Sequence, residues 1–159
     1  IESFAEWNVL KTFTQRTKAF LSVFASYSFN HSRYSGDHKD GNTKGKKVEN
    51  APASILRSGI SAGYKDILLT WQFSYVDKTY SDANNTEKPT ANGQTGLIPS
   101  YALSDLSFSW KYNKHFQLKA GINNVFDKNY FTRRAGGYPG PGLLPGDGRT
   151  FFVSVGAKF

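Results

Sequence analysis

Apolar and polar residues alternate along most of this chain with a period of two. In residues 67–78, for example, Leu69, Trp71 and Phe73 occupy every second position, with polar residues between them. A period of two is typical of β-strands, whose side chains point alternately to the two faces of a sheet, and convincing helical periodicity is absent. The pattern predicts a nearly all-β protein with about seven strands: residues 1–11, 19–33, 54–64, 67–78, 102–112, 116–126 and 151–159.

The connections between these strands alternate in length. Loops as long as some of them are uncommon in compact soluble domains. In transmembrane β-barrels, short turns on the periplasmic side alternate with long loops outside. The alternation therefore favours a membrane barrel with its long loops at one end. The short connections are residues 12–18, 64–66 and 112–115, and the long ones are residues 34–50, 81–100 and 132–148.

A membrane barrel also explains the composition. Aromatic residues make up 16% of a chain that is only 38% hydrophobic, whereas a soluble core is built mostly from aliphatic residues. In a barrel the apolar face contacts lipid, and Ser, Thr, Gln and Lys line a wet interior. Transmembrane helices are excluded, because no apolar run approaches the roughly 20 residues that a helix needs. Aromatic residues expected at the two membrane interfaces are Trp7, Tyr27, Tyr64, Tyr75, Tyr112 and Phe159.

An odd number of strands argues against a complete barrel. Bacterial single-chain barrels have an even number, and an open sheet edge cannot face hydrocarbon. The chain begins at Ile1 without an initiator Met or a leader pattern, which suggests a mature or cut piece. We therefore expect residues 1–159 to be the C-terminal part of a larger barrel, with a complete small barrel as the alternative.

Four motifs resemble those of TonB-dependent outer-membrane receptors and follow the family order. The most specific is residues 118–130, LKAGINNVFDKNY, which is similar to the motif of the penultimate strand of that family. The last strand resembles the family's assembly signal, which ends in an aromatic residue, here Phe159. Residues 48–52, VENAP, and 101–105, YALSD, resemble the family's motifs at the starts of two other strands. The residues of the main motif that carry the resemblance are Asn124, Phe126, Asp127 and Tyr130.

The resemblance implies an all-β transmembrane antiparallel barrel of about 22 strands, of which this chain holds about seven. The N-terminal plug and the energy-coupling box of the family are absent from the sequence. The implied function is import of a ferric chelate across the bacterial outer membrane, with no enzymatic activity and no cofactor, since the chelate is the cargo. The implied partners are outer-membrane lipid and lipopolysaccharide, the barrel assembly machinery, and the TonB complex acting through the missing plug.

The loop of residues 131–150, FTRRAGGYPGPGLLPGDGRT, resembles the last long loop of receptors in the ferric dicitrate group. Ferric citrate is an anion rich in carboxylates, and arginine offers planar pairs of donors to carboxylates. The predicted ligand-binding residues are therefore Arg133, Arg134, Tyr138 and Arg149. The alternative is that these arginines bind lipopolysaccharide phosphates or pair locally with Asp127 and Asp147.

Other chemistry has little support. The chain has no Cys, its histidines (His31, His38 and His115) show no metal-pair spacing, and no catalytic arrangement is recognisable, so no metal or catalytic site is predicted. The formal charge of +8 could indicate nucleic acid binding, but the basic residues are scattered among loops and turns, so none is expected. Two other functions remain open: a barrel for adhesion without transport, and a soluble carrier of the lipocalin kind with the opposite arrangement of faces.

Overall fold

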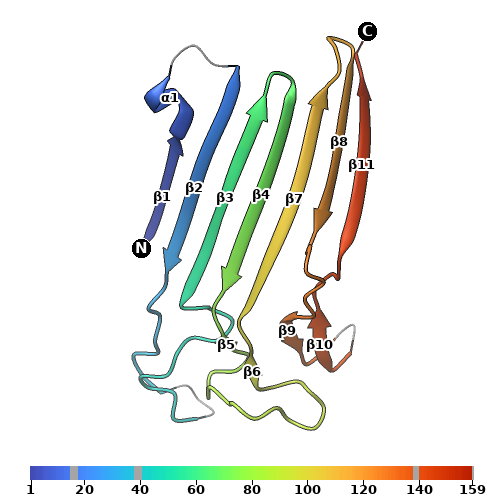
Figure 1. Cartoon of the computed structure of the whole chain (residues 1–159). Helices are drawn as coiled ribbons and strands as arrows, with labels where there is room; N and C mark the ends of the chain where they lie inside the picture. Colours follow the sequence, from blue (N-terminus) through green and yellow to red (C-terminus); the bar gives the residue numbers. More distant parts are fainter. Residues whose placement is uncertain (15–17, 38–40, 138–139, 159) are drawn as a thin grey trace.

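Seven long antiparallel strands form one open sheet in the computed structural model, which describes residues 1–14, 18–37, 41–137 and 140–158 (Figure 1). Each long strand pairs with the next long strand along the chain, and the all-β class is confirmed. Within the described residues, no helix has the length and hydropathy needed to cross a membrane. The strands are β1 (Glu2–Asn8), β2 (Ala19–Phe29), β3 (Ser54–Tyr64), β4 (Ile67–Val76), β7 (Tyr101–Lys111), β8 (Phe116–Asn123) and β11 (Thr150–Ala157).

The first predicted strand, residues 1–11, is wrong at its end, because the short helix α1 (Val9–Phe13) follows β1. Asn8 caps this helix, since its side-chain oxygen accepts a hydrogen bond from the backbone N–H of Lys11 at 3.0 Å. Asn is among the preferred residues at such a position. The indole N–H of Trp7 also donates to the hydroxyl of Thr12 at 2.8 Å, which holds the helix against the strand end.

The long connections and the short ones lie at opposite ends of the sheet (Figure 1). We call these the loop end and the turn end. The loops contain four short strands that the alternation did not predict, since two to five residues are too few to show a period. These strands form two small sheets, β5 (Thr79–Tyr80) with β6 (Leu97–Ile98) and β9 (Phe131–Ala135) with β10 (Gly142–Pro145).

The strand register gives the sheet one polar and one apolar face. Residues that pair across strands lie on the same face, so each row of partners has one character. The rows alternate between the two faces along the whole sheet. One row on the polar face is Ser22, Ser61, Thr70 and Ser107, and the next row, on the apolar face, is Val23, Ile60, Trp71 and Leu106.

Charge separates the two faces completely within these seven strands. All charged residues of the strands lie on the polar face by register, and none lies on the apolar face. A charged side chain is costly in hydrocarbon, so only the apolar face is suited to contact lipid. The charged residues of the polar face are Glu2, Glu6, Arg57, Asp105, Lys111 and Lys119.

The apolar side chains of the strands do not pack into a closed core. Leu69 is 45% exposed, Trp71 is 40% exposed and Val153 is 73% exposed. Among the described residues, Ile98, in the loop strand β6, is the only fully buried hydrophobic side chain. This arrangement agrees with a sheet whose apolar face meets lipid. It does not fit a lipocalin-like carrier, which would bury these side chains in its interior.

Two aromatic rings on the polar face cover glycines of neighbouring strands. A Cβ atom on Gly59 would lie 2.6 Å from Cε1 of Phe24, and one on Gly121 would overlap the ring of Phe152. The glycines therefore make room for rings that lie flat across the adjacent strand. This packing explains why large apolar residues occur on an otherwise polar face.

Candidate functional site

The turn after β8 is built around the side chain of Asn124, which is only 4% exposed. Its amide nitrogen donates to the carbonyl oxygens of Lys128 and Asp147, at 3.0 and 3.2 Å, and its oxygen accepts from the N–H of Lys128 at 2.8 Å. The backbone N–H of Asn124 donates to the Asp105 carboxylate on β7 at 2.8 Å. Asn124 thus joins β7 to both ends of the last long loop.

Asp127 ties the same turn to the start of β11. Its carboxylate accepts the backbone N–H of Arg149 at 2.9 Å and lies 3.5 Å from the guanidinium of that residue. The hydrogen bond from this N–H, followed by the charge of Arg149, lowers the pKa of Asp127, while partial desolvation opposes the shift. The guanidinium of Arg149 is therefore engaged locally, as the alternative interpretation of the loop arginines supposed.

Tyr130 fills the space beneath the last loop. Its ring packs on Gly146, where a Cβ atom would overlap it, and lies 4.7 Å from the ring of Tyr101 between centroids. Burial, followed by the nearby carboxylates of Asp147 and Asp105, raises the pKa of Tyr130. Phe126, by contrast, is 78% exposed. Three of the four motif residues, Asn124, Asp127 and Tyr130, thus form one folded turn.

Arg134 fastens the β9–β10 hairpin to the neighbouring loop. Its guanidinium donates to the carbonyl oxygen of Leu97 at 2.9 and 3.2 Å and to that of Gly93 at 3.0 Å. The same group lies 5.1 Å from the ring centroid of Phe131. These contacts use most of the donors of the side chain within the protein.

Arg133 occupies the adjacent position on β9 and is exposed. It lies opposite Leu144 in the hairpin register. Among the described residues, none accepts a hydrogen bond from its guanidinium or forms an ion pair with it. Two other predicted residues, Tyr138 of the ligand-binding set and Phe159 of the assembly signal, lie outside the described residues.

The three long loops are joined into one layer at the loop end (Figure 1). The Asn85 side chain accepts from the N–H of Lys47 and donates to its carbonyl oxygen, both at 2.7 Å. The N–H of Asn50 also donates to the carbonyl oxygen of Tyr80 at 2.8 Å. On the other side, Arg134 connects the second loop to the third. We call this connected structure the loop layer.

The strands also carry cations that the sequence analysis did not single out. Arg57, Lys111 and Lys119 are exposed on the polar face. The sequence could have identified them, because each occupies a position of its strand where the alternation of apolar and polar residues expects a polar-face side chain. Within the described residues, no group of three or more His, Cys, Asp or Glu side chains could hold a metal ion.

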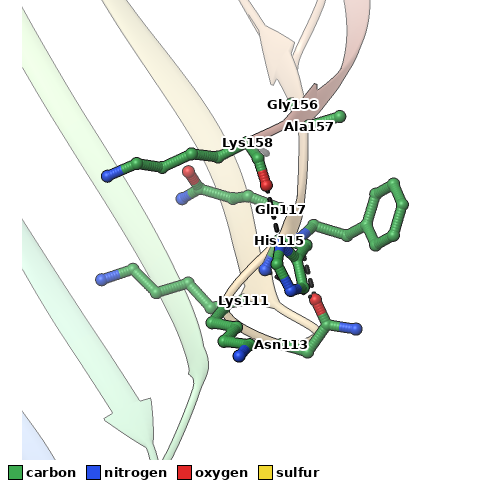
Figure 2. A pocket seen from close by; sticks show the side chains of 9 residues that line it. Lys111, Asn113, His115, Gln117, Gly156, Ala157 and Lys158 are labelled. Atoms are coloured by element: carbon green, nitrogen blue, oxygen red, sulfur yellow. Dashed lines mark hydrogen bonds between the residues drawn. The ribbon is translucent and has the colours of Figure 1, made fainter.

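A depression of about 480 Å³ lies at the turn end, between β7, β8 and β11 (Figure 2). Asn113 shapes its rim, since its side-chain oxygen accepts the N–H groups of His115 and Phe116 at 2.8 and 2.9 Å. Nδ1 of His115 donates to the carbonyl oxygen of Lys158 at 2.8 Å, which fastens the turn to the end of β11. The depression therefore has a hydrogen-bonded frame.

Comparison with known proteins finds one family and several related receptors. Residues 2–125 match the family described as TonB dependent receptor-like, beta-barrel. The chain is 32% identical over 85 residues to a probable TonB-dependent siderophore receptor, PiuA, of Acinetobacter baumannii. It is 27% identical over 133 residues to the ferrienterobactin receptor of Escherichia coli K12. These alignments cover 54% and 74% of this chain.

Solved structures show the same fold. The unliganded ferric citrate transporter FecA superposes with a TM-score of 0.86 and 24% identity over 99% of this chain. The ferric yersiniabactin uptake receptor FyuA of Yersinia pestis superposes with a TM-score of 0.72 and 17% identity, also over 99%. At these identities, the likeness concerns the fold alone.

The chain spans only a small part of each of these proteins: 10% of PiuA, 18% of the ferrienterobactin receptor and 23% of FecA. Within that part, the family match includes six of the seven long strands from β1 to β8. The two-faced sheet and the alternation of turns and loops agree with the match. The chain therefore belongs to the TonB-dependent receptor-like β-barrel family and is a protein of the bacterial outer membrane.

Proposed function

We propose that this chain is the C-terminal part of a receptor barrel that imports a ferric chelate, with ferric citrate as the substrate. Its family consists of transport receptors rather than enzymes. The similar proteins bear the names of receptors for siderophores, ferrienterobactin and ferric yersiniabactin, and of a ferric citrate transporter. Because ferric citrate occurs in only one of these names, the choice of chelate rests on the chemistry of the loops.

The observation that carries the choice of chelate is the exposed Arg133 in the loop layer. Its neighbour Arg134 donates to carbonyl oxygens, and Arg149 is paired with Asp127, whereas the guanidinium of Arg133 forms no hydrogen bond or ion pair with the described residues. A free guanidinium at the mouth of a barrel is suited to a carboxylate, which it can bind through two parallel hydrogen bonds. We propose Arg133 as a direct ligand contact and Arg134 and Arg149 as residues that position its hairpin.

The long loops are extracellular in this proposal, since short turns lie on the periplasmic side of outer-membrane barrels. The chelate binds the loop layer and then the polar interior face. A plug elsewhere in the receptor rearranges under the action of the TonB complex and releases the chelate inward. This chain supplies wall, loops and, through Phe159, the signal for the assembly machinery, with lipid and lipopolysaccharide around it.

The test is uptake of radiolabelled iron citrate by cells that make the full-length receptor, with and without TonB. We expect saturable uptake that requires TonB and is competed by excess ferric citrate. TonB-dependent uptake of iron supplied as ferric enterobactin, but not of iron supplied as ferric citrate, would assign a different chelate. TonB-dependent growth unrelated to any iron chelate, or no uptake at all, would contradict the transport function.

A variant locates the contact within the same receptor. Arg133→Ala should weaken ferric citrate binding by about tenfold or more, as expected for the loss of hydrogen bonds to a charged group. Arg133→Lys should recover only part of the affinity, because an ammonium cannot bind a carboxylate through a planar pair. Lys88→Ala, at an exposed cation of another loop, is the control. Equal affinities of Arg133→Ala and the parent would exclude this residue as a ligand contact.

A further inference from the structure

Three lysines gather on the polar face at the turn end, far from the loop layer. Lys111 on β7 and Lys119 on β8 lie in successive rows of this face, since Lys111 pairs with Gln117 and Lys119 pairs with Ser109. Lys158 follows β11, and its side chain extends to the same side as that of Gln117 (Figure 2). All three are exposed. We call Lys111, Lys119 and Lys158 the lysine cluster.

The lysine cluster is not ion-paired in the part of the chain that the structure describes. Within the described residues, no acidic side chain lies within ion-pair distance of any of the three ammonium groups. Of the acids on the polar face, Glu2 and Glu6 lie on β1 at the opposite edge of the sheet, and Asp105 accepts the N–H of Asn124 toward the loop end. The nearest acid at the turn end is Asp66, whose carbonyl oxygen accepts the N–H of Lys111 at 2.9 Å but whose carboxylate forms no ion pair with the cluster. The depression is lined by Lys111, Lys114 and Lys158 and therefore has a net positive charge, whose field attracts anions.

We propose that the lysine cluster is a weak binding site for the anionic ferric chelate as it leaves the barrel toward the periplasm. This inference rests on the proposed function. It adds a second site to the path, at the end of the interior opposite to Arg133. The ligand class is a carboxylate-rich iron chelate, and its carboxylates are the groups that the ammonium groups contact.

Lysine side chains suit a site from which the chelate is released better than a site that binds it tightly. An ammonium is a strongly hydrated point charge on a flexible stem, without the rigid donor pair that makes arginine a tight carboxylate ligand. Sites along a conduction path must attract a ligand and still release it. The hydrogen bonds of Asn113 and His115 nonetheless fix the backbone around the depression, which Lys111 and Lys158 line, and Lys119 lies on the polar face next to it.

The experiment uses the full-length receptor with Lys111→Gln, Lys119→Gln and Lys158→Gln combined, and ferric citrate as the probe. We expect the affinity at the extracellular side to stay within about twofold, while the maximal rate of energised uptake falls by roughly three- to tenfold, as electrostatic guidance predicts. The difference should shrink as salt is raised, because the field is screened. The matched control is Lys11→Gln, Lys18→Gln and Lys65→Gln, which removes three charges at the same end outside the depression.

A triple Lys→Arg variant keeps the charges and should retain most of the uptake, which separates the role of charge from that of packing. Unchanged uptake in the Gln variant would overturn the inference. A lower melting temperature than that of the matched control would overturn it as well, since the lysines would then pair with another part of the receptor. If the parent receptor does not bind ferric citrate, that result contradicts the proposed function, and the exit site that rests on it is contradicted as well.

Discussion

The side chain of Asn85 binds the backbone of Lys47 at both its N–H and its carbonyl group, each at 2.7 Å. These residues lie in different loops. The side-chain amide of Asn85 makes the two hydrogen bonds to Lys47 that the backbone of a neighbouring strand would otherwise make. Asn85 has a φ of 53°, which Asn tolerates better than most residues. This one side chain therefore links the first long loop to the second.

Asn85→Asp should loosen this link. The new carboxylate can still accept the N–H of Lys47, but it cannot donate to the carbonyl oxygen, which it then repels. We expect local opening to become easier by about 1–3 kcal/mol, the cost of a lost hydrogen bond to a partly buried group. Hydrogen exchange of the Lys47 amide measures this. Asn42→Asp adds the same charge at an exposed position of the first long loop and should leave that exchange nearly unchanged; equal acceleration in both variants would refute the role of Asn85.

Asn124→Ala should destabilise the barrel. The substitution removes three hydrogen bonds of a buried amide and places Ala at a φ of 50°. We expect a loss of at least about 1–3 kcal/mol, measured as a lower denaturant midpoint of the full-length receptor. Asn123→Ala is the control, since Asn123 is exposed and has one side-chain bond, to Thr150 at 3.1 Å. A larger loss in the control would contradict the role of Asn124.

Acid should weaken the contact between Asp127 and Arg149. The pKa of Asp127 is lower in the folded protein than its ordinary value of 3.8, mainly because of the Arg149 N–H. Its contribution to stability is therefore complete above pH 3.8 and is lost as the pH falls through the lower, folded pKa. Melting temperatures of the receptor and of Asp127→Asn should differ at neutral pH and converge in strong acid. A constant difference across that range would show that the charge of Asp127 has no part in the stability.

Arginine should be tolerated on one face of β7 and not on the other. Leu106 lies on the apolar face near the middle of the strand, and Ser107 lies next to it on the polar face. We expect Leu106→Arg to cost about 2–4 kcal/mol, as for cations at the midplane on the lipid face of barrels, and Ser107→Arg to cost far less. The fraction of folded, heat-modifiable receptor in the outer membrane measures both. The reverse order would mean that the two faces were assigned the wrong way round.

Much of the sheet was predictable because its pattern is local. Alternation in residues 67–78 anticipates β4 and places Trp71 and Gln72 on opposite faces, since a strand turns successive side chains to opposite sides whatever its neighbours are. The register then aligns Trp71 with Ile60 and Leu106, as a shared apolar face requires. The end of β1 was not predicted, because Asn8 caps a helix there, and a single capping residue is a weak signal.

By itself, the sequence determined the seven strands, their two faces, the two classes of connection and the turn motif around Asn124. Only the tertiary structure decided which loop arginines are engaged, because Arg134 reaches carbonyl groups about forty residues away in the chain, and Arg149 meets Asp127 across the last loop. It also brought Lys111 and Lys158, from different strands, to one depression. The physical reason is that face and period follow from the geometry of single strands, whereas the partners of a long polar side chain depend on where distant backbone segments end.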